Sequence, residues 1–421
     1  YSLLGGCVKK KIFVRGPVLS QSGYGEQSRF ALRALRSRED LFDIYVQPIV
    51  WGKTGWIWEN SEFRQWMDGI INKTVNLGQE KQLQPDISLQ ITIPNEFEKI
   101  CPVNIGYTAG IETSRVSAQW LQKGNDMDKV LVVSNHAKQT YLNTVYEAKN
   151  TQTGETFPYR MEKPIEVVWE NTPRAEAEPI EGFELPYNFN FLMVSQISPR
   201  KNFVNALQWW VEEFIDQEVG LVLKSNIKCN SEMDFEAFRK TVKNLLSGYP
   251  DRKCKVHILH GDLTAGQMTG LYTHPKIKAI VNIAHGEGFG LPLYEAAREG
   301  LPVVAVGWSG HMDFLTHEGI EMFQKINYTL SPVQDTAVWE GVIEKESLWA
   351  YADQGSYKMT LRKTYKTWHK AKETAEKLKQ IINENFSNKK LYDNFCDQIY
   401  KLSDGDSIED WLENLEVEEH G

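Results

Sequence analysis

The sequence lacks any long apolar run and has few cysteines. No stretch of about 18 consecutive apolar residues occurs, so a membrane-spanning helix is not predicted. The five cysteines are dispersed, without the C-x-x-C spacing of a metal site or a redox motif (Cys7, Cys101, Cys229, Cys254 and Cys396). An odd, scattered set of this kind is typical of free thiols in a reducing compartment, and we therefore expect a cytoplasmic protein.

Positive charge is in deficit. The chain has 47 Lys and Arg against 56 Asp and Glu, for a formal net charge of −9, which argues against a broad nucleic-acid-coating surface but leaves room for a local basic groove. The length of 421 residues exceeds what a single core of about 250–300 residues holds, so we expect two domains. The first residue is Tyr1 rather than Met, which indicates a chain trimmed at its N-terminus.

Short apolar runs alternate with helical patterns along both halves of the chain. In the first half, Phe30, Leu32 and Leu35 recur at helical spacing after an apolar run that ends in a Gly-Pro turn. The predicted strands cover residues 10–17, 42–50, 85–92, 103–108 and 129–135, then 189–197, 219–226, 255–261, 277–284 and 301–307. Such alternation predicts an α/β fold with parallel sheets covered on both faces.

Residues 162–187 change character. This segment is rich in Pro and Glu and contains a single predicted strand, so we interpret it as the connection between domains. The expected division is an N-terminal Rossmann-like domain with the linker (1–187), a C-terminal Rossmann-like domain (188–385) and a helical tail (386–421). Two facing domains of this kind predict a ligand site in the cleft between them.

The segment "AIVNIAHGEGFGLPLYEAAREGLPVVAV", residues 279–306, carries the strongest local signal. An apolar strand leads into a Gly-rich turn, Pro292 opens a helix, and Gly300 closes it before a second strand. Glycines ahead of a helix let a ligand approach bare backbone N–H groups, and the helix N-terminus favours an anion there. We therefore predict an anion-binding loop.

Two glutamates, Glu287 and Glu295, stand in this loop and helix with seven residues between them. Both can face one ligand that lies across the helix start. Buried carboxylates are costly unless they accept hydrogen bonds, and sugar or ribose hydroxyls are suitable donors. An ordinary strand–loop–helix turn with solvated glutamates is the alternative, and the whole pattern favours a ligand site.

The string "HGEGFGLPLYEAAREGLPVVA" resembles the E-x7-E signature of retaining GT-B glycosyltransferases of family four. Further segments resemble that family in the same order along residues 11–315. They are "GPVLSQSGYGEQSRFALRAL", "GYTAGIETSRVSAQW", "KVLVVSNHAKQTY", "VSQISPRKNF" and "GWSGHMDFL". The resemblance implies two facing Rossmann-like domains, the N-terminal one for the acceptor and the C-terminal one for the donor, with the last helices crossing back to the first domain.

The resemblance also implies roles for individual residues. Glu287 would contact hydroxyls of the donor sugar, Glu295 the nucleotide ribose, and Lys201 the leaving diphosphate. The remaining donor-binding positions, mostly backbone amides near the diphosphate, are Gly288, Phe289, Gly290 and Leu291 on one side of the cleft and Gly23 and Gly25 on the other.

Three departures from the family pattern concern charge and the acceptor side. Many members have an Arg near the position of Gln196, and this chain has none there, so Arg200 or Lys224 is expected to supply that charge. Ile111 stands where a Trp is common. No His falls in the loop around Glu112, which makes Glu112 the candidate polar group at the reaction centre on the N-terminal side.

A metal site is not predicted. Two D-x-D pairs occur in turn-like contexts and offer the alternative of a metal–diphosphate site (Asp126 and Asp128, Asp404 and Asp406). His257 and His260 alternate along one predicted strand without an evident third ligand. We expect these histidines to be core or rim residues.

The acceptor side offers one aromatic segment, "VWGKTGWIWEN". Trp56 and Trp58, with Trp51 and Lys53 nearby, can stack on a sugar or on a nucleobase. A loop anchored by its own tryptophans is the alternative. The two residues are nevertheless our candidates for acceptor binding.

The resemblance implies transfer of a hexosyl group from a nucleoside diphosphate sugar to an acceptor hydroxyl, with the anomeric configuration retained. The nucleotide sugar is a co-substrate, with a UDP-sugar preferred to a GDP-sugar, and no prosthetic group is expected. A glycan or a lipid-linked sugar is the expected acceptor. Two alternatives stay open, namely transfer to a hydroxymethylated base in DNA and a catalytically silent nucleotide-sugar-binding subunit.

Overall fold

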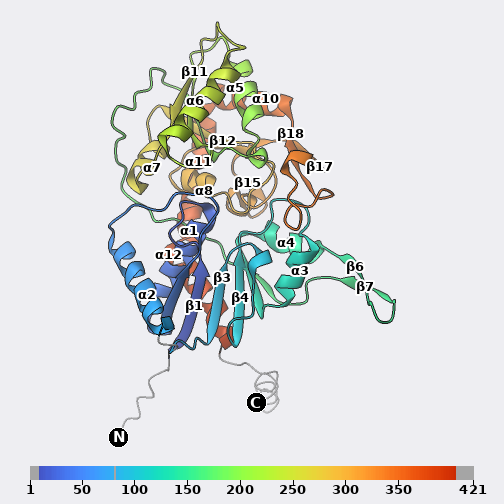
Figure 1. Cartoon of the computed structure of the whole chain (residues 1–421). Coiled ribbons are helices and arrows are strands. Elements are labelled where there is room, and N and C mark those ends of the chain that lie inside the picture. Colours follow the sequence, from blue (N-terminus) through green and yellow to red (C-terminus); the bar gives the residue numbers. More distant parts are fainter. Residues whose placement is uncertain (1–8, 80–81, 404–421) are drawn as a thin grey trace, which may run out of the picture.

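The structure, a computed structural model, describes residues 9–79 and 82–403. Cys7, the Asp404/Asp406 pair and the end of the predicted tail, 404–421, lie outside the described residues. Figure 1 shows two α/β halves, one above the other, each built around its own parallel sheet. The predicted α/β architecture of two Rossmann-like halves is confirmed.

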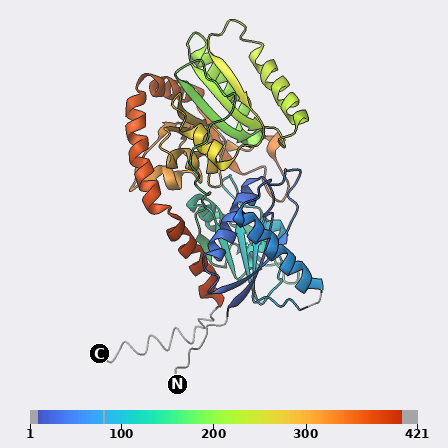
Figure 2. The same cartoon turned by 90° about the vertical axis from the view of Figure 1, so that its left-hand side faces the viewer.

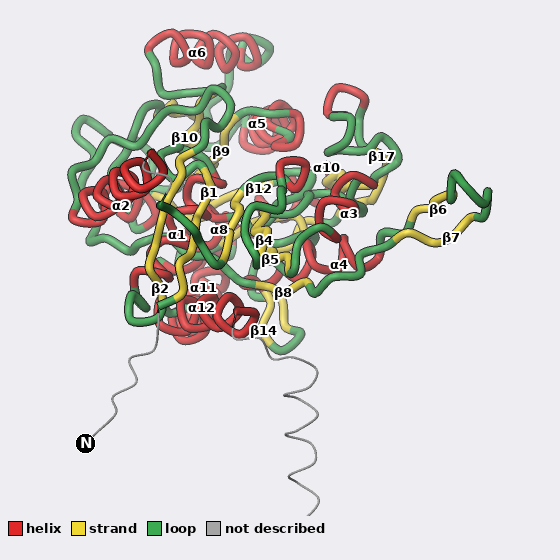
Figure 3. Tube along the Cα trace, turned by 60° about the horizontal axis from the view of Figure 1, so that its bottom comes forward, coloured by secondary structure: helices red, strands yellow, loops and turns green. Residues whose placement is uncertain are grey.

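The first half holds a six-stranded parallel sheet in the order β2-β1-β3-β4-β5-β8. Its strands are β1 (Lys10–Gly16), β2 (Phe42–Pro48), β3 (Ile87–Ile91), β4 (Val103–Thr108), β5 (Lys129–Val132) and β8 (Ile165–Val167). Its helices are α1 (Gly23–Arg36), α2 (Glu62–Gln79), α3 (Ala118–Asn125) and α4 (Asn135–Asn143), with a 3-10 turn η1 (Pro94–Glu96). The antiparallel hairpin of β6 (Tyr146–Lys149) and β7 (Thr156–Tyr159) projects away from the sheet (Figure 3).

The second half repeats the plan, with the sheet order β11-β10-β9-β12-β13-β16. Its strands are β9 (Asn190–Gln196), β10 (Gly220–Asn226), β11 (Lys255–Leu259), β12 (Ile277–Asn282), β13 (Val303–Val306) and β16 (Gln324–Ile326). Its helices are α5 (Phe203–Phe214), α6 (Glu232–Leu246), α7 (Ala265–Tyr272), α8 (Leu291–Arg298) and α9 (Met312–Leu315), with 3-10 turns η2 (Pro199–Lys201) and η3 (Asp335–Ala337). Two antiparallel pairs are added, β14 (Thr316–His317) with β15 (Ile320–Glu321) and β17 (Tyr328–Pro332) with β18 (Leu348–Ala352).

Three helices end the described chain: α10 (Gln354–Lys366), α11 (Trp368–Asn385) and α12 (Asn388–Ser403). Figure 2 shows α11 and α12 running in succession from the second half down along the first. Helix α11 packs on α8, whereas α12 packs on α1, where Phe395 meets Phe30 and Tyr107. The last helix therefore belongs to the core of the first half.

In both sheets the carboxyl ends of the central strands lie at the boundary between the halves. In each sheet the first strand, β1 or β9, has neighbours on both sides that follow it in the chain, so the strand order reverses there. In open α/β sheets, ligands bind outside the carboxyl ends of the strands at this reversal. The loops that follow β1, β9 and β12 therefore border the expected site, and the loop that follows β4 lies at the same edge of the first sheet.

The halves also touch on both sides of this boundary. Asp313 of α9 accepts hydrogen bonds from Asn135 N (2.8 Å) and from Trp169 Nε1 (2.8 Å). In the loop between β17 and β18, Val342 is buried within an apolar cluster of the first half that includes Trp120. The Gly341 carbonyl beside it accepts a hydrogen bond from Ser117 Oγ at 2.8 Å. The two halves are thus in direct contact in the described structure.

Candidate functional site

The predicted Gly-rich loop leaves β12 and enters α8 at the boundary between the halves. Gly290 adopts φ = +92° as the N-cap of α8, and Pro292 stands in the first turn of the helix. Within the described part of the chain, the backbone amides of Gly288, Phe289 and Gly290 meet no hydrogen-bond acceptor. Unpaired amides ahead of a helix N-terminus form a surface suited to an anion.

Glu287 is the centre of a buried charge cluster. Its side chain, in a residue only 5% exposed, accepts from Lys201 Nζ at 2.5 Å, from Arg200 Nη1 at 3.1 Å and from Asn282 Nδ2 at 2.9 Å. Burial alone would raise the pKa of Glu287, but the two cations outweigh that effect and hold the pKa well below its usual range. Glu287 therefore stays ionised at any ordinary pH.

Arg200 joins the two halves. Its guanidinium contacts the carboxylate of Glu112, in the first half, at 3.4 Å, and it donates to the Gly286 carbonyl at 2.7 Å. Glu112 and Glu287, which lie 175 positions apart, therefore share one cation. The fold thus places three predicted residues (Lys201, Glu287 and Glu112) around Arg200.

Lys224 lies apart from this cluster. It is at the end of β10 and donates to the Gly261 carbonyl at 2.6 Å. Of the two candidates for the missing charge near Gln196, Arg200 is the one in contact with Glu287. The η2 turn explains this placement, because Arg200 and Lys201 are consecutive there and both reach the carboxylate.

Glu295 lies in α8 with both carboxylate oxygens engaged. Thr172 Oγ1, from the segment between the halves, donates at 2.8 Å, and Tyr272 Oη donates at 2.9 Å. Burial raises the pKa of Glu295, and these two hydroxyls partly offset that shift. The contacts show that this position accepts hydrogen bonds from hydroxyl groups.

The loop after β1 begins α1 close to the same region. Ser22 caps the helix by accepting from the Gly25 amide at 3.1 Å, while Gly23 is exposed. Tyr24 Oη bonds to Thr108 Oγ1 at 2.8 Å, which ties this loop to the end of β4. The first-half glycines therefore sit at carboxyl strand ends, as the Gly-rich loop of the second half does.

Trp56 and Trp58 are exposed, at 59% and 93%. The Ile57 amide between them donates to the Leu19 carbonyl at 2.9 Å, which fixes this segment beside the loop that precedes α1. The neighbouring Trp51 instead packs on Tyr24, with ring centroids 4.5 Å apart. Trp51 is thus an anchor, whereas the two predicted acceptor residues are free to meet a ligand.

Three residues around the loop were not predicted from the sequence. Ser309 Oγ accepts from the Glu287 amide at 2.9 Å, and His311 is buried with its Nε2 bonded to the Val306 carbonyl at 2.6 Å. His136 bonds to the Thr113 carbonyl, and burial lowers its pKa to about 4. Ser309 and His311 directly follow β13, within the segment "GWSGHMDFL". The family resemblance of that segment was the one sequence signal that indicated a turn at this place.

The alternative metal ligands lie elsewhere. Asp128 directly precedes β5 and accepts from the Asn104 amide at 2.7 Å, so it is at the amino ends of the strands, away from the site. His260 bonds to Asp234 at 2.8 Å. No group of three or more His, Cys, Asp or Glu side chains in the described ranges is arranged to hold a metal ion.

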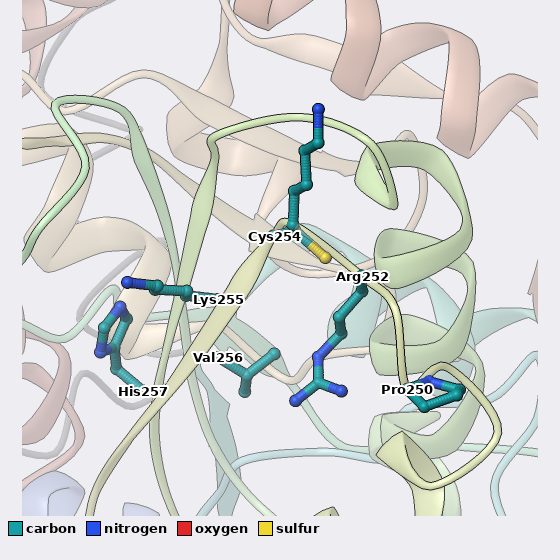
Figure 4. Close-up of a pocket in the computed structure, with 7 residues that line it drawn as sticks. Pro250, Arg252, Cys254, Lys255, Val256 and His257 are labelled. Atoms are coloured by element: carbon teal, nitrogen blue, oxygen red, sulfur yellow. The ribbon is translucent and has the colours of Figure 1, made fainter.

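Two surface hollows are separate from this site. Figure 4 shows the smaller, of about 280 Å³, along the edge strand β11, with Arg252, Lys255 and His257 in its wall. The larger, of about 770 Å³, lies along α10 and includes Arg362 and Lys363. None of the predicted site residues lines either of them.

No protein-family model matches the chain, and no curated protein matches it by sequence. Solved structures do match it over nearly the whole length. HepE of Anabaena, in complex with UDP and glucose, is 11% identical with a TM-score of 0.55 and covers 93% of this chain and 100% of its own. Sucrose-phosphate synthase of Thermosynechococcus elongatus is 12% identical with a TM-score of 0.59 over 95% and 100%.

A third match is a trehalose-6-phosphate protein from E. coli bound with UDP-2-fluoro glucose, 10% identical, with a TM-score of 0.54 over 94% and 99% of the two chains. The chain has the GT-B fold. At these identities the likeness extends to the fold alone. Among the described residues, no helix combines the length and the apolar character that crossing a bilayer requires.

Proposed function

We propose that the chain is a glycosyltransferase that transfers a hexosyl group from a nucleoside diphosphate sugar, in the manner of the retaining enzymes of family four that its loop resembles. The observation that carries this proposal is the set of unpaired amides at residues 288–290 directly after Glu287 and its two cations. An anionic diphosphate satisfies the amides, and a sugar beside it can donate its hydroxyls to Glu287.

The proposed roles follow from these contacts. Lys201 and Arg200, with the amides of residues 288–291, stabilise the diphosphate, and Glu295 accepts from the ribose in place of Thr172 and Tyr272. The anomeric carbon breaks its bond to the diphosphate oxygen and bonds to the acceptor oxygen on the same face. The acceptor proton passes to the departing phosphate. Stabilisation of the leaving charge then supplies most of the rate enhancement.

We further propose a UDP-sugar as donor, because two of the matching structures hold UDP or a UDP-sugar. Glu112, Gly23 and Gly25 complete the donor side from the first half, and Trp56 and Trp58 border the acceptor. A glycan or lipid-linked sugar in the cytoplasm is the proposed acceptor. Two exposed indoles beside the loop that precedes α1 suit the apolar face of a sugar ring.

A thermal-shift panel tests the donor assignment. UDP-, GDP- and ADP-sugars are compared at one common concentration, where a ligand present at about a hundredfold excess over its dissociation constant stabilises by about 2.7 kcal/mol and a weaker one by less. We expect a UDP-sugar to raise the melting temperature most and to be hydrolysed slowly without acceptor. A donor that binds without any hydrolysis would favour the silent-subunit alternative, and no shift from any nucleotide sugar would refute the proposal.

Activity is expected to survive excess EDTA. The diphosphate charge is met by Lys201, Arg200 and backbone amides, so transfer should not depend on an added cation. The measurement is sugar transfer before and after chelation. Complete loss of transfer that manganese or magnesium restores would contradict the cation-and-amide account.

The acceptor is identified by the fate of a labelled sugar. We expect label on small glycans or lipid-linked acceptors and none on duplex DNA that carries hydroxymethylated bases. Trp56→Ala should lower transfer about tenfold, since stacking on an aromatic ring is worth about 1–3 kcal/mol per base and a sugar face is of similar size. Label in acid-precipitable DNA, with binding that weakens steeply as salt rises, would establish the nucleic-acid alternative instead.

A further inference from the structure

A tight turn after β13 wraps around the Gly-rich loop. Within this turn, residues 307–311, Ser309 adopts φ = +88°, in the left-handed region that favours glycine. In the described ranges three residues other than glycine have positive φ, namely Asn202, Ser309 and Glu318. Asn202 directly follows Lys201, so two of the three strained positions border the charge cluster.

The turn holds both main-chain polar groups of Glu287. Ser309 Oγ accepts from the Glu287 amide at 2.9 Å, and the Gly310 amide donates to the Glu287 carbonyl at 2.9 Å. A Cβ on Gly310 would lie 1.8 Å from the Gly288 carbonyl oxygen, so the two loops are in direct backbone contact. The backbone of Glu287 is therefore fixed from outside its own loop.

The conformation of Ser309 is unfavourable for the residue itself. A side chain at positive φ brings Cβ close to the backbone, and a glycine at the same place would be free of that strain. Ser309 is also only 5% exposed, so solvent does not account for a hydroxyl there. Compared with a glycine at this position, the serine adds one interaction, in which its hydroxyl oxygen accepts a hydrogen bond from the Glu287 N–H.

We propose that Ser309 is a positioning residue that sets Glu287 between its cations and the donor sugar. The proposal rests on the proposed function, in which the Glu287 carboxylate meets sugar hydroxyls. Without the Ser309 hydroxyl, the peptide group at the Glu287 amide can rotate. The carboxylate then moves away from the position in which it accepts hydrogen bonds from Lys201, Arg200 and Asn282. The strain at Ser309 is the cost of that orientation.

Two substitutions separate strain from orientation. Ser309→Gly and Ser309→Ala both remove the hydroxyl, but only Gly removes the strain. We expect kcat with the best donor of the panel to fall about tenfold in both, the effect of about one lost hydrogen bond, with KM within about twofold. The melting temperature of Ser309→Gly should exceed that of Ser309→Ala. Turnover is thus expected to depend on the presence of the Ser309 hydroxyl, whereas stability depends on whether residue 309 has a Cβ atom.

Glu318→Gly is the matched control, because Glu318 has φ = +49° in the exposed turn between β14 and β15. It should leave kcat unchanged. The positioning role would be overturned if either Ser309 variant had the wild-type kcat. It would also be overturned if the loss of kcat were fully explained by a larger fraction of unfolded protein. If Glu287→Gln also keeps wild-type turnover, the proposed function of the site fails. If Glu287→Gln is impaired while Ser309→Gly is not, only the positioning role fails.

Discussion

Replacing Glu287 by Gln is expected to lower turnover at least about a hundredfold and to destabilise the fold. The carboxylate lies buried between Lys201 and Arg200, at 2.5 and 3.1 Å. Its removal leaves two buried cations without their counter-charge, and the loss of one partner of a buried ion pair costs about 3–5 kcal/mol. Steady-state kinetics and chemical denaturation measure the two effects.

Glu236→Gln is the matched control for this change. Glu236 lies on α6, is exposed, and pairs with Arg239 at the surface, so neither stability nor turnover should change measurably. Wild-type turnover in Glu287→Gln would remove the carboxylate from the reaction. Normal stability in that variant would contradict the charge cluster itself.

Gly286→Ala is expected to abolish most activity by keeping the halves apart. A Cβ at this position would lie 2.4 Å from the Glu112 carbonyl oxygen and 3.0 Å from the Glu112 Cβ, both in the opposite half. Because a displacement of about 1 Å at a reaction centre can cost about a hundredfold in rate, we expect at least that loss. The two halves should still fold, since the clash arises only where they meet.

Small-angle scattering measures the predicted opening as a larger radius of gyration, alongside the kinetic assay. Gly248→Ala is the control, because a Cβ there meets no atom within 4 Å. An active Gly286→Ala variant with an unchanged radius would mean that the closed contact between Gly286 and Glu112 is not needed for transfer.

The residues that could be predicted from the sequence are those with local signals. Glycines and Pro292 mark the start of a helix, and apolar strands on either side mark its place in a sheet, so the turn that enters α8 and the helix itself lie where the sequence predicts them. Lys201 follows a predicted strand in the same way. In each case a few consecutive residues specify the turn.

The residues that could not be predicted depend on contacts between distant segments. Nothing near Ser309 in the chain indicates that its hydroxyl meets Glu287, 22 positions earlier. The choice between Arg200 and Lys224 likewise depended on which side chain the fold aims at the carboxylate. The hairpin of β6 and β7 was also not predicted, because its strands have only four residues each and so short a run carries little periodic signal.

Calorimetric titration of UDP and of the full donor against two variants tests the central claim, that α8 and its loop bind the donor. Glu295→Gln should weaken both ligands by similar factors, about tenfold to more than a hundredfold, because each contains the ribose. Glu287→Gln should leave UDP binding unweakened, because that carboxylate is assigned to the sugar. If Glu287→Gln weakens UDP as much as Glu295→Gln does, the assigned division between sugar and ribose is wrong.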